Sequence, residues 1–247
     1  MPKLYLGTIG WSYNFWKGSF YPRNTTSTDY LAYYSSQFNT VEVDSTFYHL
    51  PMQSTVESWR LQVPEGFVFS LKFPQLITHF KDLKDCEQET ATFLGRAELL
   101  KEKLGAMLLQ FPPNFTGSRM TDLSDYLAKL PKQYNYAIEV RHKSWLTQEF
   151  ISLLRENGVA LVTTEKSITE FEATADFLYI RWEGDRKSVN GQKGEIEVDK
   201  AEDLQTWADK LRPRLNKGLK VFGYFGKYYS GLPPSDVQIL WKNICQV

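Results

Sequence analysis

The stretch Phe38-Asn-Thr-Val-Glu-Val-Asp-Ser-Thr-Phe-Tyr-His-Leu-Pro51 begins as a strand and ends in a loop. Val41 and Val43 alternate with Glu42 and Asp44, so one face of the strand is apolar and the other is ionisable. In an ordinary sheet the ionisable face would meet water. In a closed barrel it faces the interior, where carboxylates need partners. The stretch is therefore a candidate wall of a functional site inside a barrel.

Length and composition favour one large soluble α/β domain covering residues 1–247. The chain has 247 residues, of which 42% are apolar, and it carries 29 basic and 29 acidic side chains, so its net charge is 29 − 29 = 0. A neutral chain argues against a protein that coats nucleic acid or lies on a membrane surface, because neither could rely on a positive field. Nucleic acid is thus a less favoured partner.

The sequence indicates a cytoplasmic protein without a membrane span or a cysteine-based metal site. No apolar run approaches the ~20 residues that cross a bilayer. The segment Met1-Pro-Lys-Leu-Tyr-Leu6 enters a strand directly and lacks the plan of a signal peptide. Cys86 and Cys245 form no Cys-x-x-Cys pair, which excludes zinc or iron–sulfur sites built on cysteine.

Strand patterns alternate with helical periodicity along the whole chain. Besides the strand in the opening stretch, strands are predicted at Lys3–Gly10, Phe67–Phe73, Gly105–Phe111, Tyr134–Arg141, Val159–Thr164, Phe177–Trp182 and Lys220–Phe225. Helices are predicted at Thr28–Gln37, Ser54–Gln62, Leu83–Lys103, Thr121–Leu130, Thr147–Asn157, Lys200–Leu215 and Ser235–Cys245. Gly158 would end the fifth of these helices as its C-cap. The segment Lys166–Thr174 is short and polar, so the helix after strand six is weak or missing.

This count predicts a single-domain (β/α)8 TIM barrel, which takes ~250 residues. The rival is an open doubly wound sheet, which usually carries a glycine-rich phosphate turn after its first strand. Gly7-Thr-Ile-Gly10 matches that fingerprint only in part.

Charged side chains of both signs are predicted to meet at the carboxyl ends of the strands, where such barrels place their active sites. The apolar parity, expected to face the helices, comprises Val41, Val43, Phe69, Leu71, Met107, Leu109, Ile138, Val140, Leu178 and Ile180. The opposite parity, expected in the interior, comprises Glu42, Asp44, Ser70, Lys72, Gln110, Glu139, Arg141, Thr163, Glu165 and Arg181. Val68, Ala106, Leu108 and Ala137 would fill the barrel floor. The alternative for any single charge pair is a salt bridge that closes the barrel top and does no chemistry.

The histidines and the aromatic residues add two weaker signals. His49, His79 and His142 each follow a predicted strand, and with the nearby carboxylates they could hold a divalent metal. Their spacing matches no metal motif, and hydrogen-bonded loop histidines are the favoured alternative. Aromatic side chains cluster after strands one and eight, where most would pack under the loops, but Trp11 directly follows a strand and could stack on a ligand.

Several stretches resemble the family known as domain of unknown function 72, also called YecE-like. The matching stretches are Gly10–Pro22, Phe38–Tyr48, Phe69–Pro74 with Thr78-His79, Leu109–Pro113, and Ala137–His142 with Ser144-Trp145. The resemblance implies a fold similar to TIM barrels and no settled activity, substrate or cofactor. Family members often carry Asn-Asn after strand eight, whereas this chain has Gly226-Lys227.

The leading hypothesis is an enzyme, a hydrolase, lyase or isomerase, that acts on a polar, anionic small molecule of phosphorylated or nucleotide-like character. The candidate catalytic residues are Glu42, Asp44, Glu139 and Lys72. The candidate substrate-binding residues are Trp11, Gln110, Arg141, Arg181, Lys227 and Tyr228. One alternative is a metal-dependent hydrolase or isomerase using His49, His79 and His142, and another is a nucleic-acid or protein binding module without catalysis. The loop Glu183–Val198 is either a lid over the site or a plain solvated loop.

Overall fold

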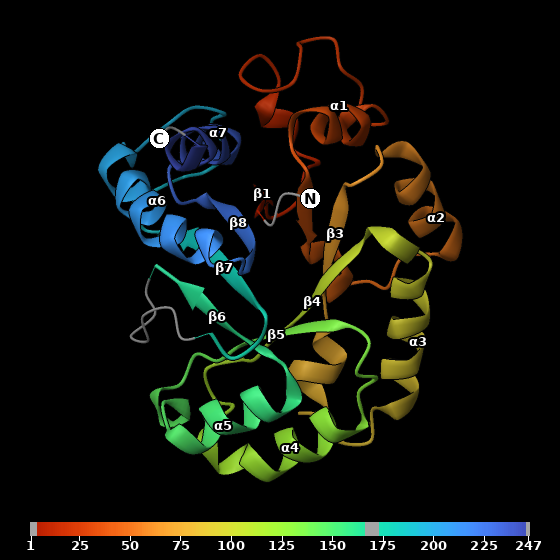
Figure 1. The fold of residues 1–247 in the computed structure, drawn as a ribbon. Helices are drawn as coiled ribbons and strands as arrows, with labels where there is room; N and C mark the ends of the chain where they lie inside the picture. The colour runs from red at the N-terminus through yellow and green to blue at the C-terminus, as the bar shows by residue number, and fades with distance from the viewer. Residues whose placement is uncertain (1–3, 166–172, 246–247) are drawn as a thin grey trace.

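Eight parallel strands form a nearly closed barrel surrounded by helices in the computed structural model, which describes residues 4–165 and 173–245 (Figure 1). The strands are β1 (Leu4–Thr8), β2 (Thr40–Val43), β3 (Val68–Lys72), β4 (Leu104–Gln110), β5 (Asn135–Glu139), β6 (Ala160–Thr164), β7 (Phe177–Gly184) and β8 (Lys220–Tyr228). The helices are α1 (Tyr30–Gln37), α2 (Gln53–Gln62), α3 (Glu87–Glu98), α4 (Met120–Lys129), α5 (Gln148–Asn157), α6 (Ala201–Asn216) and α7 (Pro233–Cys245). The predicted TIM-barrel fold is confirmed.

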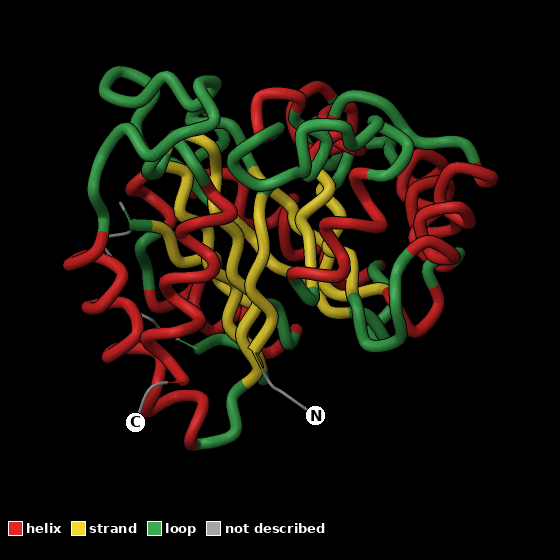
Figure 2. Tube along the Cα trace, turned by 90° about the horizontal axis from the view of Figure 1, so that it is seen from above, coloured by secondary structure: helices red, strands yellow, loops and turns green. Residues whose placement is uncertain are grey.

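The strands pair in the order β1-β8-β7-β6-β5-β4-β3-β2, each parallel to its neighbour. The register sets Gln110 of β4 beside Glu139 of β5, and Thr164 of β6 beside Arg181 of β7. Most loops gather at one end of the strands, and the described chain begins near the other end (Figure 2). Since the described chain begins with β1, the loop-rich end is the carboxyl end of the parallel strands.

Side chains close the barrel between β1 and β2, where backbone pairing among the described residues is limited to a bridge between Ile9 and Glu42. The side-chain amide of Asn39 donates to the Leu4 carbonyl at 2.8 Å and accepts from the Leu6 amide at 3.2 Å, so it stands in for a strand residue. A Cβ at Gly7 would lie 2.0 Å from the Thr40 carbonyl oxygen. The two strands therefore approach closely without a ladder.

The hydroxyl of Tyr34 is a second side-chain group that links β1 to β2 at this seam. It accepts from the Thr8 amide at 2.8 Å and donates to the Thr40 carbonyl at 3.0 Å. Tyr34 comes from α1 and is fully buried, so the helix that follows β1 also ties β1 to β2.

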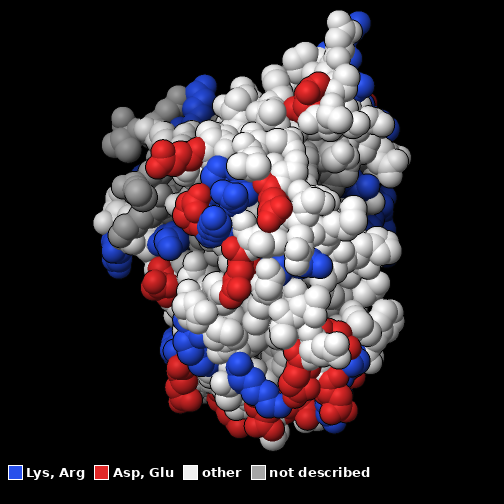
Figure 3. Space-filling model, turned by 90° about the vertical axis from the view of Figure 1, so that its right-hand side faces the viewer, with Lys and Arg blue, Asp and Glu red and all other residues white. Residues whose placement is uncertain are grey.

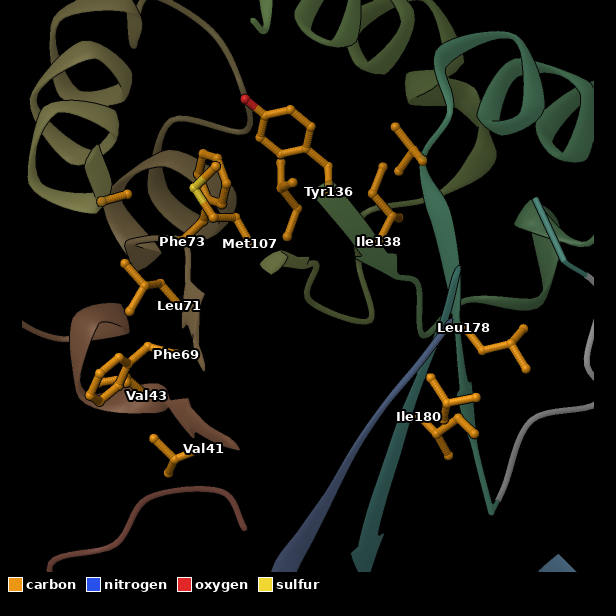
Figure 4. Close-up of a cluster of buried hydrophobic side chains, with 14 of the residues drawn as sticks. Val41, Val43, Phe69, Leu71, Phe73, Met107, Tyr136, Ile138, Leu178 and Ile180 are labelled. Carbon is orange, nitrogen blue, oxygen red and sulfur yellow. The ribbon is translucent and has the colours of Figure 1, made fainter. Parts of the chain in front are cut away.

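The parity prediction is confirmed for β2, β3, β4, β5 and β7. It is wrong for β6, where Ala160 and Val162 face the interior and Thr163, predicted to face it, pairs with the outward Ile180; Thr164 instead lies beside Arg181. The predicted outward side chains belong to the core between strands and helices, and Figure 4 shows the labelled ones projecting from the strands toward the helical layer. A separate cluster fills the interior: Val68, Ala106, Leu108, Ala137, Ala160, Val162, Phe177, Tyr179, Phe222 and Tyr224. It contains all four residues predicted for the barrel floor. The floor is thus apolar and packed, which confines the ionisable groups to the upper end.

The helix predicted over 83–103 is shorter than expected, because α3 begins at Glu87 and ends at Glu98. Asp82, Leu83 and Asp85 have positive φ angles of 49°, 69° and 46°, which no right-handed helix accommodates. Short turns of 3-10 or π type fill the loops: Asn14–Trp16, Asp44–Phe47, Leu76–Phe80, Lys101–Lys103, Gly117–Arg119 and Lys143–Trp145.

Other elements match the prediction more closely. Gly158 ends α5 with φ 64° as expected, and the Thr147 hydroxyl caps the start of that helix by accepting from the Phe150 amide. The prediction of a weak or missing helix over 166–174 falls largely on residues 166–172, which lie outside the described residues.

The surface is mixed in charge on the face shown in Figure 3, where acidic and basic side chains lie interspersed among neutral ones. Among the described residues, no helix has both the length and the apolar character needed to cross a membrane.

Candidate functional site

Arg181 of β7 is the centre of a buried ion cluster at the carboxyl end of the barrel. Its guanidinium donates to both oxygens of Glu42 on β2, at 3.0 Å, and to Glu139 on β5 at 2.6 Å. A third carboxylate, Glu183, accepts from the same side chain. Arg181 is 3% exposed and Glu42 is fully buried, so strands on opposite sides of the interior meet through one guanidinium.

Arg141 extends this cluster toward solvent. Its Nε donates to Glu139 at 3.2 Å and its Nη2 lies 3.3 Å from a Glu183 oxygen. The Arg141 side chain is 40% exposed and that of Glu183 is 35% exposed. We call Glu42, Glu139, Arg141, Arg181 and Glu183 the Arg181 cluster. Its rim, formed by Arg141 and Glu183, is its most exposed part.

Lys72, the last residue of β3, joins the cluster through Gln110 and forms no direct ion pair with a described residue. Its Nζ donates to Gln110 Oε1 at 2.7 Å, and Gln110 Nε2 donates to Glu139 Oε1 at 2.7 Å. The ammonium also lies 4.0 Å from the ring centroid of Phe47. Because Glu139 can only accept, the amide of Gln110 is fixed with its oxygen toward Lys72.

Burial and charge move the pKa values of these groups in different directions. Burial raises the pKa of Glu42, although Arg181 and the Tyr179 hydroxyl, which donates at 2.7 Å, favour its charged form. Burial would also raise the pKa of Glu139, but Arg181 and Arg141 outweigh it and lower that pKa. Two carboxyl groups held by one guanidinium therefore differ in proton affinity, as an acid and a base in one site must.

The pKa of Lys72 is lowered, first by burial and then by the positive charge of Arg181. The carboxylates of Glu42 and Glu139 oppose this shift. With all its groups ionised, the Arg181 cluster has three carboxylates and two guanidinium groups, so its formal charge is −3 + 2 = −1. An ammonium on Lys72 would bring the total charge to zero. Protonation of Lys72 and of the carboxylates is therefore coupled.

Asp44 and Glu165 lie at the edge of this arrangement. The chain leaves β2 at Val43 and enters a 3-10 turn at Asp44, so strand parity no longer directs this side chain. The Asp44 carboxylate acts instead on the loop after β1, where its charge contributes to raising the pKa of Tyr13 behind the larger effect of burial. Glu165 accepts from the backbone amides of Glu183 and Gly184, which holds the end of β7 in place.

Among the described residues, three predicted substrate-binding side chains, those of Trp11, Lys227 and Tyr228, form no hydrogen bond or ion pair with the Arg181 cluster, although Tyr228 pairs with Gly184, next to Glu183. The ring of Trp11 packs edge-on against Trp59, and also against Phe69 in the layer outside the barrel, so the idea that it stacks on a ligand receives no support. The ring centroid of Tyr228 lies 5.1 Å from Lys227 Nζ and 5.0 Å from Arg186 Cζ. Tyr228 lines a cavity of about 450 Å³ under α6, whose lining does not include Lys72, Arg141 or Arg181.

The histidines make local contacts. His79 Nδ1 lies 2.9 Å from the Thr78 hydroxyl, and its ring packs edge-on against Phe47. His142 Nδ1 lies 2.7 Å from the Ser144 hydroxyl, and His49 is exposed. In the described part of the chain, no group of three or more His, Cys, Asp or Glu residues is arranged to hold a metal ion. The alternative with His49, His79 and His142 as metal ligands therefore has no geometric support.

The loop 185–198 is packed against its neighbours. Glu197 accepts from the backbone amides of Asn190 and Gly191 and pairs with Lys193. A Cβ at Gly194 would lie 1.9 Å from the Phe15 carbonyl oxygen, so this loop touches the loop after β1. These contacts favour a fixed loop over a lid.

Sequence reasoning missed Glu183 and Tyr179 as members of the site. Both share the parity of Arg181 on β7, while Leu178, Ile180 and Trp182 alternate with them in the outer core. Extending the predicted strand past Trp182 to its observed end at Gly184 would have found Glu183.

Residues 5–245 match the family described as "Protein of unknown function DUF72". The chain is 34% identical over 145 residues to the UPF0759 protein YecE of Escherichia coli strain K12, which covers 59% of this chain and 51% of YecE. It is 31% identical over 168 residues to the UPF0759 protein YunF of Bacillus subtilis strain 168, covering 63% of this chain and 58% of YunF. The matches thus span about half the length of these curated relatives.

Solved structures share the fold over nearly the whole chain. A crystal structure of a DUF72 family protein from Thermotoga maritima MSB8 superposes with a TM-score of 0.78 at 28% identity and covers 99% of each chain. One from Enterococcus faecalis V583 has a TM-score of 0.72 at 21% identity, covering 99% of this chain and 96% of the other, and shows the fold alone.

Proposed function

The chain belongs to the DUF72 family, and we propose that this member is an enzyme that binds a polar, anionic small molecule at the carboxyl end of its barrel and acts on it by proton transfer. The observation that carries the proposal is the Arg181 cluster, which is buried at its centre and open at the rim formed by Arg141 and Glu183. Barrels of this class place their chemistry at this end of the strands.

Stability is a poor explanation for the cluster, because taking charges out of water costs about as much as their pairing returns. Buried ionisable groups whose pKa values move apart are instead characteristic of sites that exchange protons. Glu42, with its raised pKa, and Glu139, with its lowered pKa, are such a pair.

The roles follow from exposure. Glu42 is fully buried, and Arg181 shares its donors among three carboxylates, so both serve to position the rest. Arg141 is the cation that an anionic ligand can reach. Glu139, Glu183 and Lys72 are the groups placed to exchange protons with the ligand, and Gln110 fixes the orientation of Lys72.

The test is thermal stabilisation by inorganic phosphate, compared with sodium chloride at equal ionic strength. A ligand that binds only the native state at 100 times its Kd adds about 2.7 kcal/mol to the free energy of unfolding, which raises the Tm of a chain of this size by roughly 5–10 °C. Arg141→Ala should abolish this gain. Lys143→Ala, a matched control at an exposed lysine in the same loop, should keep it. The proposed site would be contradicted if phosphate did not raise the Tm of the wild-type protein, or if it raised the Tm of both variants equally.

A further inference from the structure

We propose that Lys72 is a nucleophilic amine that forms a Schiff base with an aldehyde or ketone carrying a carboxylate or phosphate group. The inference rests on the proposed function, because it takes the Arg181 cluster as a ligand site. It adds the class of substrate and the covalent step.

Lys72 differs from the other cations of the site in its contacts. Arg181 and Arg141 both pair directly with carboxylates, at 2.5 to 3.3 Å. Lys72 is 8% exposed, and among the described residues its ammonium contacts the amide oxygen of Gln110 and the ring of Phe47. A buried ammonium without a directly paired carboxylate is costly, and losing a proton removes the cost.

Electrostatics acts in the same direction. Burial lowers the pKa of Lys72, and the adjacent positive charge of Arg181 lowers it further. The face of the Phe47 ring favours the ammonium form, which limits the shift. Desolvation beside a second cation is a known means of activating a lysine for attack on carbonyl groups. Each unit by which the pKa falls raises the fraction of neutral amine at neutral pH about tenfold.

The geometry also orients the amine. One N–H of Lys72 is held by Gln110 Oε1 at 2.7 Å, and Gln110 cannot turn because its Nε2 is held by Glu139 at 2.7 Å. This hydrogen bond is available to the neutral amine as well as to the ammonium, so deprotonation frees a lone pair without breaking the contact.

The step balances with water as the leaving molecule. Nζ attacks the carbonyl carbon to form a C–N bond, the carbonyl oxygen takes up a proton, and nitrogen gives one up. The hydroxyl then leaves with a second proton as water, and the C=N bond of a protonated imine forms. Glu183, the most exposed carboxylate of the Arg181 cluster, exchanges these protons with solvent, and Arg141 holds the anionic group.

The experiment traps the imine by reduction. The protein is incubated at neutral pH with glyoxylate and sodium cyanoborohydride, which converts an imine on lysine to a stable carboxymethyl-lysine, and labelled positions are mapped by peptide mass spectrometry. The expected result is that Lys72 is labelled faster than the exposed Lys143, because burial and Arg181 lower the pKa of Lys72 and so raise its fraction of neutral amine.

Two further comparisons identify the site. Arg141→Ala should slow labelling of Lys72 by glyoxylate but not by glycolaldehyde, an uncharged aldehyde of similar size, and Lys143→Ala should leave both rates at Lys72 unchanged. Labelling at Lys72 is measured in the wild-type protein. The test therefore does not require the Lys72→Arg variant, which lacks the amine, to fold.

The outcomes separate this inference from the proposed function. Labelling at Lys72 no faster than at Lys143 overturns the Schiff base, and if phosphate still stabilises the wild type through Arg141, the proposed anion site stands. If phosphate gives no stabilisation and Lys72 is not preferred, both fail.

Discussion

Replacing Arg181 by methionine tests how the buried carboxylates are held. The substitution keeps a long side chain but leaves Glu42 and Glu139 without the guanidinium that donates to them at 3.0 and 2.6 Å. Removing one partner of a buried ion pair costs about 3–5 kcal/mol, because the other charge stays buried and unpaired. For a chain of this length we expect the Tm to fall by roughly 6–20 °C.

The stability lost in Arg181→Met should depend on pH. Without Arg181 the folded-state pKa of Glu42, which burial already raises, should rise further, and that of Glu139 should rise above its value in the unfolded chain. A group with a raised folded pKa contributes stability below its unfolded pKa, and this stability is lost as the pH rises through the folded pKa. The deficit of Arg181→Met should therefore be largest near about pH 8 and shrink toward about pH 5.

The assay is urea unfolding at both pH values, with Arg141→Met as the matched control. Arg141 pairs with two of the same carboxylates but is 40% exposed, so its loss should cost less than about 1 kcal/mol. If Arg181→Met is no less stable than Arg141→Met at either pH, the carboxylates do not depend on Arg181 and the account of the cluster is wrong.

Three more predictions concern the rest of the barrel. Gly7→Ala should cost roughly 2–3 kcal/mol in urea unfolding, because its Cβ would meet the Thr40 carbonyl at 2.0 Å; Gly95→Ala in α3, where no atom lies within 4 Å of the new Cβ, should instead add roughly 0.5–1 kcal/mol. Asn39→Ala should cost about 1–2 kcal/mol through the loss of two hydrogen bonds to β1, and an unchanged stability would show that the seam does not depend on them. Burial raises the pKa of Asp236 to about 7, so its contribution to wild-type stability should decline as the pH rises from about 4 to 7; Asp236→Asn should flatten that part of the curve, and equal slopes in the two proteins would exclude a raised pKa.

The period of two along the strands predicted the division between interior and outer core. Val41, Phe69 and Ile138 lie in the outer core, while Ala106 and Leu108 lie in the interior. The prediction works because each buried strand must present one parity to the helices and the other to the barrel interior. Glu42, Lys72 and Arg181 were correctly assigned to one interior for the same reason.

The contacts of the site could not be derived in this way. Arg141 lies beyond the end of β5, where parity no longer applies, and it still reaches Glu139 because both side chains face the same rim. The carboxylates that pair with Arg181 are determined by the register between strands that are distant in the sequence. The helix begins at Glu87 and not at Leu83, because residues in 82–85 have positive φ angles. Asp and Leu rarely adopt such angles, and the sequence does not signal them.

The seam between β1 and β2 has a mechanical consequence. Everywhere else around the described barrel, neighbouring strands are tied by backbone ladders, whose spacing fixes their separation and alignment. At the seam, the amide of Asn39 and the hydroxyl of Tyr34 take that place, and both sit on side chains that rotate. The barrel is therefore a rolled sheet whose seam is held by these two side chains and by the single backbone bridge between Ile9 and Glu42. A change in girth, such as a bulky ligand would demand, can be taken up along this line without breaking a ladder.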